Sequence, residues 1–389
     1  MPSPQTLGAI SERVGAPLAS LGLPPNVAHA VAAALRIHLQ RRHHMIEIPA
    51  IPTLNDAALA QALRQAIDHK TKPLGSLGRL EALALQLGLI LGSATPRLDH
   101  PQLVVFAADH GLAARGVSAY PSDVTWQMVE NFLAGGAAVS VLARQHGLAL
   151  TVVDCGVKHE FSPREGLVVA KTAWGTADCT RGPAMTAKQM RAALDAGSAL
   201  VRALPGNTLL LGEMGIGNTS AAALLMARLT DEPIAACVGR GTGLDDAGLA
   251  RKLGVLEEAL ALHAQAVAPL DAMMALGGLE IATMTGAVLE AARQRRVIVV
   301  DGFITTAAVA LATALAPPVL QRCVFAHCSA ESGHARWLQH LGVQPLLDFG
   351  LRLGEGSGAA LAWPLLESAC RVLCEMASFE SAGVSKKTP

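Results

Sequence analysis

Charge of one sign and aromatic side chains are what this sequence most clearly lacks. Among its 389 residues, 31 Lys and Arg balance 31 Asp and Glu, and aromatic residues make up only 3%. Without a positive excess, binding to nucleic acid through bulk charge is excluded. A hydrophobic fraction of 51% excludes an acidic disordered chain, because it is ample for a folded core.

Charged residues of both signs are also few. They make up 16% of the chain, whereas about a quarter is usual in soluble domains. Together with 37 glycines, this composition favours an α/β protein whose sheet is buried on both faces. The length fits one large domain, alone or with a smaller one.

No segment predicts a membrane helix or a secretory signal. The most apolar stretch, residues 303–320, contains three threonines and breaks at Pro317-Pro318, which is typical of a buried helix in a soluble protein. No N-terminal segment combines a basic start, an apolar stretch and a cleavage site. The seven cysteines form no CxxC motif, so free thiols are expected. We therefore predict a cytoplasmic protein without membrane contact.

Short apolar runs, each followed by a polar residue and glycine or serine, recur through the middle of the chain. They occupy residues 103–107, 150–153, 208–211, 297–300 and 323–326. Continuous apolar runs that alternate with helical segments predict a parallel, Rossmann-like sheet flanked by helices. Right-handed crossovers place the polar ends of such strands at one sheet edge, where open α/β folds bind ligands.

Helical patterns flank this region on both sides. One helix is predicted to begin at Asn55 as its cap and another near Ser76, and a C-terminal helix covers about residues 358–377. We predict a small helical domain from residues 45–96 plus 355–389 and a large α/β catalytic domain over 97–354. Residues 1–44 form an extension of uncertain status.

The loop of residues 212–220 (GEMGIGNTS) lies between a predicted strand and a predicted helix. Gly215 and Gly217 let backbone amides approach an anion at a helix N-terminus. The spacing nearly matches a P-loop, but Asn218 stands where that motif needs lysine, which argues against hydrolysis of nucleoside triphosphates. A small phosphate ester or a ribose fits, and the alternative is a tight turn without a ligand.

Two further glycine-rich loops follow. Residues 239–243 (GRGTG) precede a helix on which Lys252 either binds an anion or is solvated. In residues 352–358 (RLGEGSG), three glycines surround Glu355, as expected where the backbone must approach another group closely. A positioned, partly desolvated carboxylate suits a general base, and the alternative is a solvated glutamate in a turn.

Other polar clusters are weaker candidates. His327, Glu331 and His334 match no common zinc motif, and we expect Ser329 to cap a helix containing the latter two. Asp109 and His110 have no serine or cysteine in a nucleophile elbow beside them, so Asp109 is predicted to shape a strand end. We therefore predict no metal site.

Several segments together resemble one known family. Residues 72–81 (KPLGSLGRLE) are similar to the N-terminal signature of the nicotinate-nucleotide–dimethylbenzimidazole phosphoribosyltransferases, which act in the lower-ligand branch of cobalamin synthesis. Further motifs of that family are matched in order by residues 108–111 (ADHG), 212–219 (GEMGIGNT), 300–303 (VDGF) and 352–358 (RLGEGSG). The resemblance covers about residues 49–376 and leaves the extension outside.

The resemblance implies transfer of phosphoribose from nicotinate mononucleotide to 5,6-dimethylbenzimidazole, which releases nicotinate and gives α-ribazole 5′-phosphate. By the same resemblance Glu355 is the general base, and Glu213 orients the ribose or the base. The resemblance implies that the 5′-phosphate is held by the glycine loops with Gly215, Gly217, Asn218, Thr219, Gly239 and Gly241, and that Lys252 lies near the nucleotide. Asp301, Ser329 and Gly354 are further candidate substrate-binding residues. The resemblance also implies a homodimer that requires neither metal nor cofactor.

One region departs from the family pattern. Where a relative presents a serine and a glutamine to the benzimidazole, this chain has Tyr120 and Met128. The pocket wall is therefore expected to be more apolar, and core packing is the alternative role for Tyr120. The preferred base stays open among dimethylbenzimidazole, another benzimidazole, adenine and a phenol.

Two other functions compete with this one. A phosphoribosyltransferase that uses phosphoribosyl pyrophosphate normally needs magnesium and a paired-acid motif, which residues 152–156 (VVDCG) lack. A non-catalytic nucleotide-binding or sensor protein of the same fold would be expected to tolerate loss of Glu355. The presence of both Glu213 and Glu355 favours the enzyme.

Overall fold

The fold is organised around one parallel sheet. The computed structural model describes residues 47–241 and 243–385, and the chain from Pro49 onward forms one compact unit. The predicted extension, residues 1–44, lies outside the described residues. The sheet has six parallel strands in the order β3-β2-β1-β4-β5-β6. They are β1 (Gln102–Ala108), β2 (Ala149–Gly156), β3 (Leu167–Val169), β4 (Thr208–Met214), β5 (Val297–Val300) and β6 (Cys323–Phe325).

All five predicted strands are confirmed, and so is the α/β class with its parallel sheet. Every residue of β1, β5 and β6 is buried, as their continuous apolar runs predicted. The short edge strand β3 was not predicted, because three residues with a half-exposed pattern give too weak a periodic signal.

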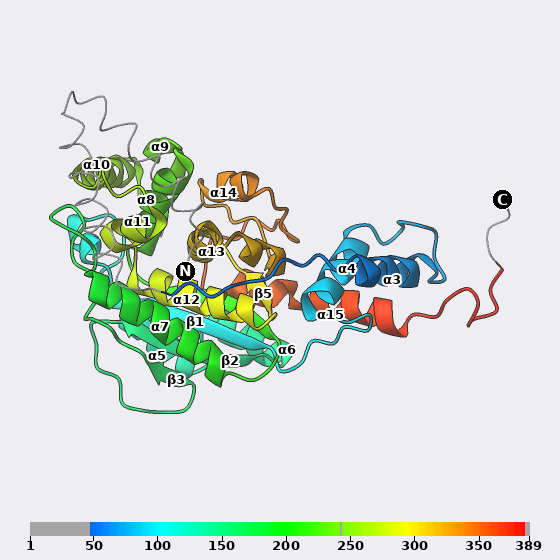
Figure 1. The fold of residues 1–389 in the computed structure, drawn as a ribbon. Coiled ribbons are helices and arrows are strands. Elements are labelled where there is room, and N and C mark those ends of the chain that lie inside the picture. The colour runs from blue at the N-terminus through cyan, green and yellow to red at the C-terminus, as the bar shows by residue number, and fades with distance from the viewer. Residues whose placement is uncertain (1–46, 242, 386–389) are drawn as a thin grey trace, which may run out of the picture. The chain divides into compact units, whose positions relative to one another are not determined.

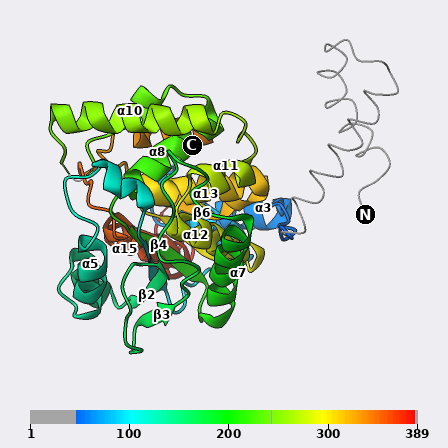
Figure 2. The same cartoon turned by 90° about the vertical axis from the view of Figure 1, so that its left-hand side faces the viewer.

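Helices cover both faces of the sheet (Figures 1 and 2). On one face, α12 packs against the central strands and against α7 and α13, while α5, α6 and α15 cover the other face. The helices are α3 (Ala57–Asp68), α4 (Arg79–Leu91), α5 (Val124–Leu133), α6 (Ala138–His146), α7 (Ala187–Ala203), α8 (Asn218–Thr230), α9 (Ile234–Cys237), α10 (Asp246–Leu262), α11 (Pro269–Leu276), α12 (Leu279–Arg293), α13 (Phe303–Leu315), α14 (His334–Leu341) and α15 (Ser357–Glu375), with 3₁₀ turns η1 (Gly111–Arg115) and η2 (Pro317–Arg322).

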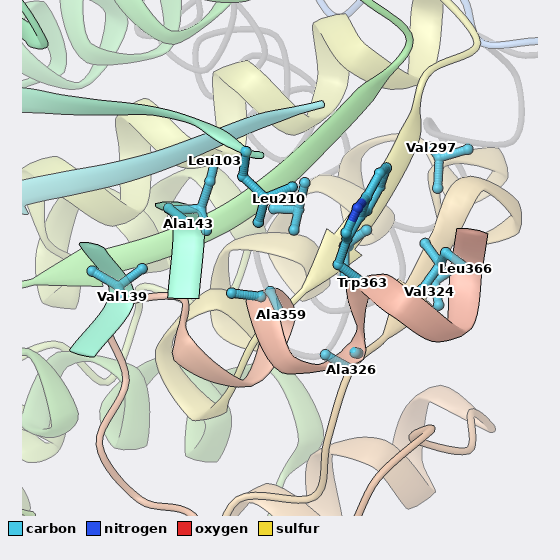
Figure 3. Packing of buried hydrophobic residues seen from close by; sticks show 14 of the residues in the cluster. Leu103, Val139, Ala143, Leu210, Val297, Val324, Ala326, Ala359, Trp363 and Leu366 are labelled. Atoms are coloured by element: carbon cyan, nitrogen blue, oxygen red, sulfur yellow. The ribbon is translucent and has the colours of Figure 1, made fainter. Parts of the chain in front are cut away.

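The hydrophobic core on the α15 side joins the sheet to the terminal helices. Leu103 and Leu210 of the sheet, Val139 of α6 and Trp363 of α15 belong to one buried cluster (Figure 3). The same cluster extends to buried leucines of α4, which packs against α15, and of α3, which packs against α4 (Figure 1). This continuous packing fixes the start of α15, and with it the residues just before the helix.

Two predicted helix starts were wrong. The cap of α3 is Asp56, whose carboxylate accepts a hydrogen bond from the Leu59 N–H at 2.9 Å, and not the neighbouring Asn55. α4 begins at Arg79, later than predicted, because Gly75 and Gly78 adopt left-handed conformations in the preceding turn. The apolar stretch from residue 303 is the buried helix α13, as predicted. No helix among the described residues is long and apolar enough to cross a membrane.

Candidate active site

A cavity of about 530 Å³ lies beyond the carboxyl ends of β4, β5 and β6. This is the sheet edge at which the sequence predicted polar strand ends to gather. Nine of the predicted site residues line the cavity: Tyr120, Glu213, Gly215, Asn218, Thr219, Gly241, Ser329, Gly354 and Glu355. The other five do not line it: Met128, Gly217, Gly239, Lys252 and Asp301.

Three helices begin around this cavity. The residues that precede α8, α13 and α15 are Gly217, Gly302 and Gly356, none of which offers a capping side chain, although Asp301 binds the first N–H groups of α15. First-turn N–H groups of α8 and α13 are therefore available to a ligand, and the helix dipoles favour negative charge there. The arrangement suits a phosphate ester in the cavity.

Glu213 is a buried carboxylate that is held in place by two donors. It lies near the end of β4, and its side chain accepts hydrogen bonds from the Asn218 amide and from the backbone N–H of Glu355. Burial, reinforced by the negative charge of Asp301, raises its pKa to about 8. The close approach of Gly354 explains that glycine, because a Cβ there would lie 2.2 Å from Glu213 Oε1.

Glu355 adopts an unusual backbone conformation. Its φ is 66°, and it lies between Gly354 at 80° and Gly356 at 95°. Such a conformation is costly for a residue with a Cβ and persists only where the surroundings enforce it, often at functional sites. Strain of this kind argues against the alternative of an ordinary solvated glutamate in a turn.

The Glu355 carboxylate is buried and only partly hydrogen-bonded. It is buried and lines the cavity, and its Oε2 has no hydrogen-bond partner within the described part of the chain. Burial raises the pKa of Glu355 to about 7, with Asp301 adding to the rise, while the backbone N–H of Val139 in α6 opposes it. A carboxylate poised near neutral pH suits a general base.

Asp301 forms hydrogen bonds with the backbone that directly follows Glu355. Its carboxylate accepts hydrogen bonds from the N–H groups of Gly356 at 3.1 Å and Ala359 at 2.9 Å, at the start of α15. His327 Nε2 lies 3.5 Å from Asp301 Oδ1, and this neighbour raises the pKa of His327 although burial alone would lower it. The structure therefore places Asp301 where it can hold the Glu355 loop.

Lys252 is buried beneath the glycine loops, so the alternative of a solvated lysine on a helix face is wrong. Its Nζ donates to Thr219 Oγ1 at 2.9 Å and to the Gly239 carbonyl at 3.2 Å. Burial lowers its pKa to about 8, although the nearby Glu331 opposes this shift. A buried cation that ties both loops together strengthens the case for an anionic ligand at this end of the cavity.

Tyr120 and Met128 differ in their surroundings. Tyr120 is 54% exposed and lines the cavity, so the alternative role of core packing is wrong for it. Met128 is partly buried against the hydrophobic core, with its sulfur 3.9 Å from the Asn131 amide. It does not line the cavity.

Other lining residues were not assigned a role from the sequence. His327, Glu331 and Arg352 all line the cavity, and Arg352 Nη1 donates to the Gly241 carbonyl at 3.3 Å. His327 and Glu331 follow β6, so their position just after a predicted strand could have marked them as candidates for the site. The predicted helix cap at Ser329 was wrong, because α14 begins only at His334 and Gly333 precedes it. Among the described side chains, no group of His, Cys, Asp and Glu could hold a metal ion.

Comparisons with known proteins agree with this arrangement. A family model described as "Phosphoribosyltransferase" matches residues 51–384. The nicotinate-nucleotide–dimethylbenzimidazole phosphoribosyltransferase of Variovorax paradoxus is 69% identical over 340 residues, which cover 87% of this chain and 97% of that protein. The enzyme of the same name from Cupriavidus necator is 60% identical over 347 residues, 88% of this chain and 100% of that protein.

A solved structure gives the same result in three dimensions. The crystal structure of CobT from Thermus thermophilus superposes with a TM-score of 0.82 at 44% sequence identity, covering 85% of this chain and 100% of that one. Ordered sequence motifs, the parallel sheet and the glutamate-lined cavity thus point the same way: this chain belongs to the nicotinate-nucleotide–dimethylbenzimidazole phosphoribosyltransferase family.

Proposed function

We propose that this chain transfers the phosphoribosyl group of nicotinate mononucleotide to 5,6-dimethylbenzimidazole or a related base. Nicotinate leaves from a cationic pyridinium and needs little help from a general acid. The attacking azole nitrogen forms the new bond to the anomeric carbon with inversion, and the other ring N–H becomes acidic. A single base that removes this proton completes the reaction and leaves α-ribazole 5′-phosphate.

The observation that carries this proposal is the state of Glu355. Glu355 lines the cavity, and its buried Oε2 has no hydrogen-bond partner among the described residues. Its pKa of about 7 leaves a large share ionised at neutral pH while keeping it basic enough to accept a proton. Glu213 has the higher pKa of about 8, so it is mostly protonated at neutral pH and is less available there as a base. We therefore assign the base role to Glu355 and an orienting role to Glu213.

We assign the nucleotide phosphate to the glycine loops of the same cavity. The uncapped start of α8 with Gly215, Asn218 and Thr219, the Gly239 and Gly241 loop, and the buried Lys252 supply N–H donors and positive charge. Ser329, which lines the same cavity, is the candidate hydroxyl contact. Aligning both substrates in this cavity would supply much of the rate enhancement.

A direct assay tests the transfer. The purified chain is incubated with nicotinate mononucleotide and dimethylbenzimidazole without added metal, and nicotinate release is followed by chromatography. We expect release that depends on the base. Release only with phosphoribosyl pyrophosphate and magnesium would contradict the proposal, and nucleotide binding without release would favour the non-catalytic alternative.

Tyr120 is our candidate for the residue that sets the base preference. It lines the cavity and is half-exposed, whereas Met128 packs against the core. In competition assays with dimethylbenzimidazole, adenine and a phenol, Tyr120→Ser is expected to change the product ratio about three- to tenfold. Met128→Gln is the matched control and is expected to leave the ratio unchanged. Equal shifts in both variants would remove Tyr120 from this role.

Three properties of the whole chain are also proposed. The packing of α3 on α4 and of α4 on α15 supports a small helical domain over residues 45–96 and 355–389, beside the catalytic domain of residues 97–354. Family membership supports a homodimer that works in the cytoplasm. Light scattering on the purified chain should give twice the mass of one chain, and a monomer would contradict the dimer.

A further inference from the structure

His334 lies under the cavity wall and connects two of its loops. Its Nδ1 is 2.7 Å from the backbone N of Ser329, which follows β6. Its Nε2 is 3.0 Å from Thr306 Oγ1, in the first turn of α13, and the Thr306 hydroxyl is in turn 2.7 Å from the carbonyl oxygen of Gly302. His334 and Thr306 are fully buried, whereas Ser329 and Gly302 both line the cavity.

The donors and acceptors of this chain can be arranged in only one direction. The Ser329 N–H is a donor, so Nδ1 of His334 must accept and the ring proton must reside on Nε2. Nε2–H then donates to Thr306 Oγ1, and the Thr306 hydroxyl donates to the Gly302 carbonyl. Burial, with the neighbouring His327 adding to it, lowers the pKa of His334 to about 3, so the ring stays neutral under assay conditions.

We propose that this histidine relay, Ser329–His334–Thr306–Gly302, positions the cavity wall for the nucleotide. The two loops follow different strands, β6 and β5, and carry the Ser329 hydroxyl and the uncapped start of α13. A neutral imidazole between them sets their separation, because each of its two nitrogens has one partner on a different loop. His334 and Thr306 are thus positioning residues, and the inference rests on the proposed function of the cavity.

A neighbouring residue offers a matched comparison. Thr305 is as buried as Thr306, and its hydroxyl donates to the same Gly302 carbonyl at 3.0 Å. No hydrogen bond between Thr305 and His334 is found among the described residues. Replacing either threonine by valine removes one donor to Gly302 at nearly constant shape, but only Thr306→Val also leaves the His334 Nε2–H without its acceptor.

The experiment compares these variants in steady-state kinetics, calorimetric binding of nicotinate mononucleotide and thermal unfolding. We expect Thr306→Val to raise KM and Kd for the nucleotide about tenfold relative to Thr305→Val, with kcat changed less than about threefold and a similar Tm in both. Thr306→Ser keeps the hydroxyl and should stay within about twofold of the wild type. If Thr306→Val does not fold, His334→Gln, which loses the acceptor for Ser329, should show the same rise.

Equal KM and Kd values in the two valine variants would overturn the relay, as would a Thr306→Val protein that binds the nucleotide like the wild type. Failure of the proposed function looks different. A wild-type protein that binds nicotinate mononucleotide but releases no nicotinate would contradict the transfer, and the Kd comparison would still decide for or against the relay.

Discussion

The segments that carry Glu213 and Glu355 both line the cavity, but their carboxylates differ in how they are hydrogen-bonded. Glu213 lies within a regular strand, and both a side-chain amide and a backbone N–H bind its carboxylate. Glu355 lies in a strained turn between left-handed glycines, and its Oε2 is buried without a partner in the described chain. A carboxylate whose oxygens have hydrogen-bond partners is held in place, whereas a carboxylate oxygen without a partner can accept a proton.

The loops also depend on each other. The backbone N–H of Glu355 donates to the Glu213 carboxylate, and Gly354 leaves the space that this carboxylate occupies. Asp301 accepts hydrogen bonds from the N–H groups of Gly356 and Ala359, just after Glu355, and its charge raises the pKa of both glutamates. The two segments therefore form a single carboxylate cluster, within which we propose that Glu213 orients the substrates and Glu355 takes the proton.

The largest effect is expected for Glu355→Gln. The amide keeps the shape of the side chain but cannot accept the azole proton, so kcat should fall about 10²–10⁴-fold. Binding of nicotinate mononucleotide, measured by calorimetry, should change less than about threefold, because Glu355 is not assigned to the nucleotide. If Glu355→Gln keeps the wild-type kcat, Glu355 is not the general base.

The sequence predicted the sheet and the glutamate loops, but it could not predict how each carboxylate is satisfied. Continuous apolar runs mark buried strands, and their polar ends collect at one edge by topology alone. The hydrogen bond from the Glu355 N–H to Glu213 joins residues far apart in sequence, so no local pattern reveals it. The same holds for the burial of Lys252 and for the absence of Met128 from the cavity lining, because both follow from tertiary packing.

Glu213→Gln should have a smaller effect of a different kind. The glutamine oxygen can accept from only one of the two donors well, and its NH₂ group faces the other, so the Glu355 loop loses part of its support. We expect kcat/KM to fall about ten- to a hundredfold, with KM for the nucleotide also changed. Steady-state kinetics on both glutamine variants decide the comparison. A greater loss of kcat in Glu213→Gln than in Glu355→Gln would reverse the assigned roles.

The pH profile should follow the Glu355 carboxyl. A general base works only when deprotonated, so kcat/KM should rise up to about tenfold per pH unit below pH 7 and level off above its pKa of about 7. Asp301→Asn removes the negative charge that adds to this raised pKa, so the rising limb should move to lower pH. A limb that does not move in Asp301→Asn would show that another group controls the profile.

The smallest expected effect is on the free energy of unfolding. Each glutamate should change it over a different pH range. Both have folded-state pKa values above the ordinary value of 4.5, about 8 for Glu213 and about 7 for Glu355. The folded state therefore holds their protons more tightly than the unfolded state, and the free energy of unfolding falls as pH rises above 4.5 until each folded pKa is passed. The slope is at most about 1.4 kcal/mol per pH unit for each group.

Urea unfolding at pH 5, 6, 7 and 8 resolves the two contributions. Glu355→Gln should flatten the fall mainly below pH 7, whereas Glu213→Gln should also flatten it between pH 7 and 8, where Glu213 alone still gives up its proton. The exposed Glu257→Gln on α10 is the control for a generic loss of charge and should keep the wild-type slope. If both active-site variants flatten the same interval, the two carboxyls titrate as one coupled pair, and the separation between an orienting and a reacting glutamate rests on the kinetics alone.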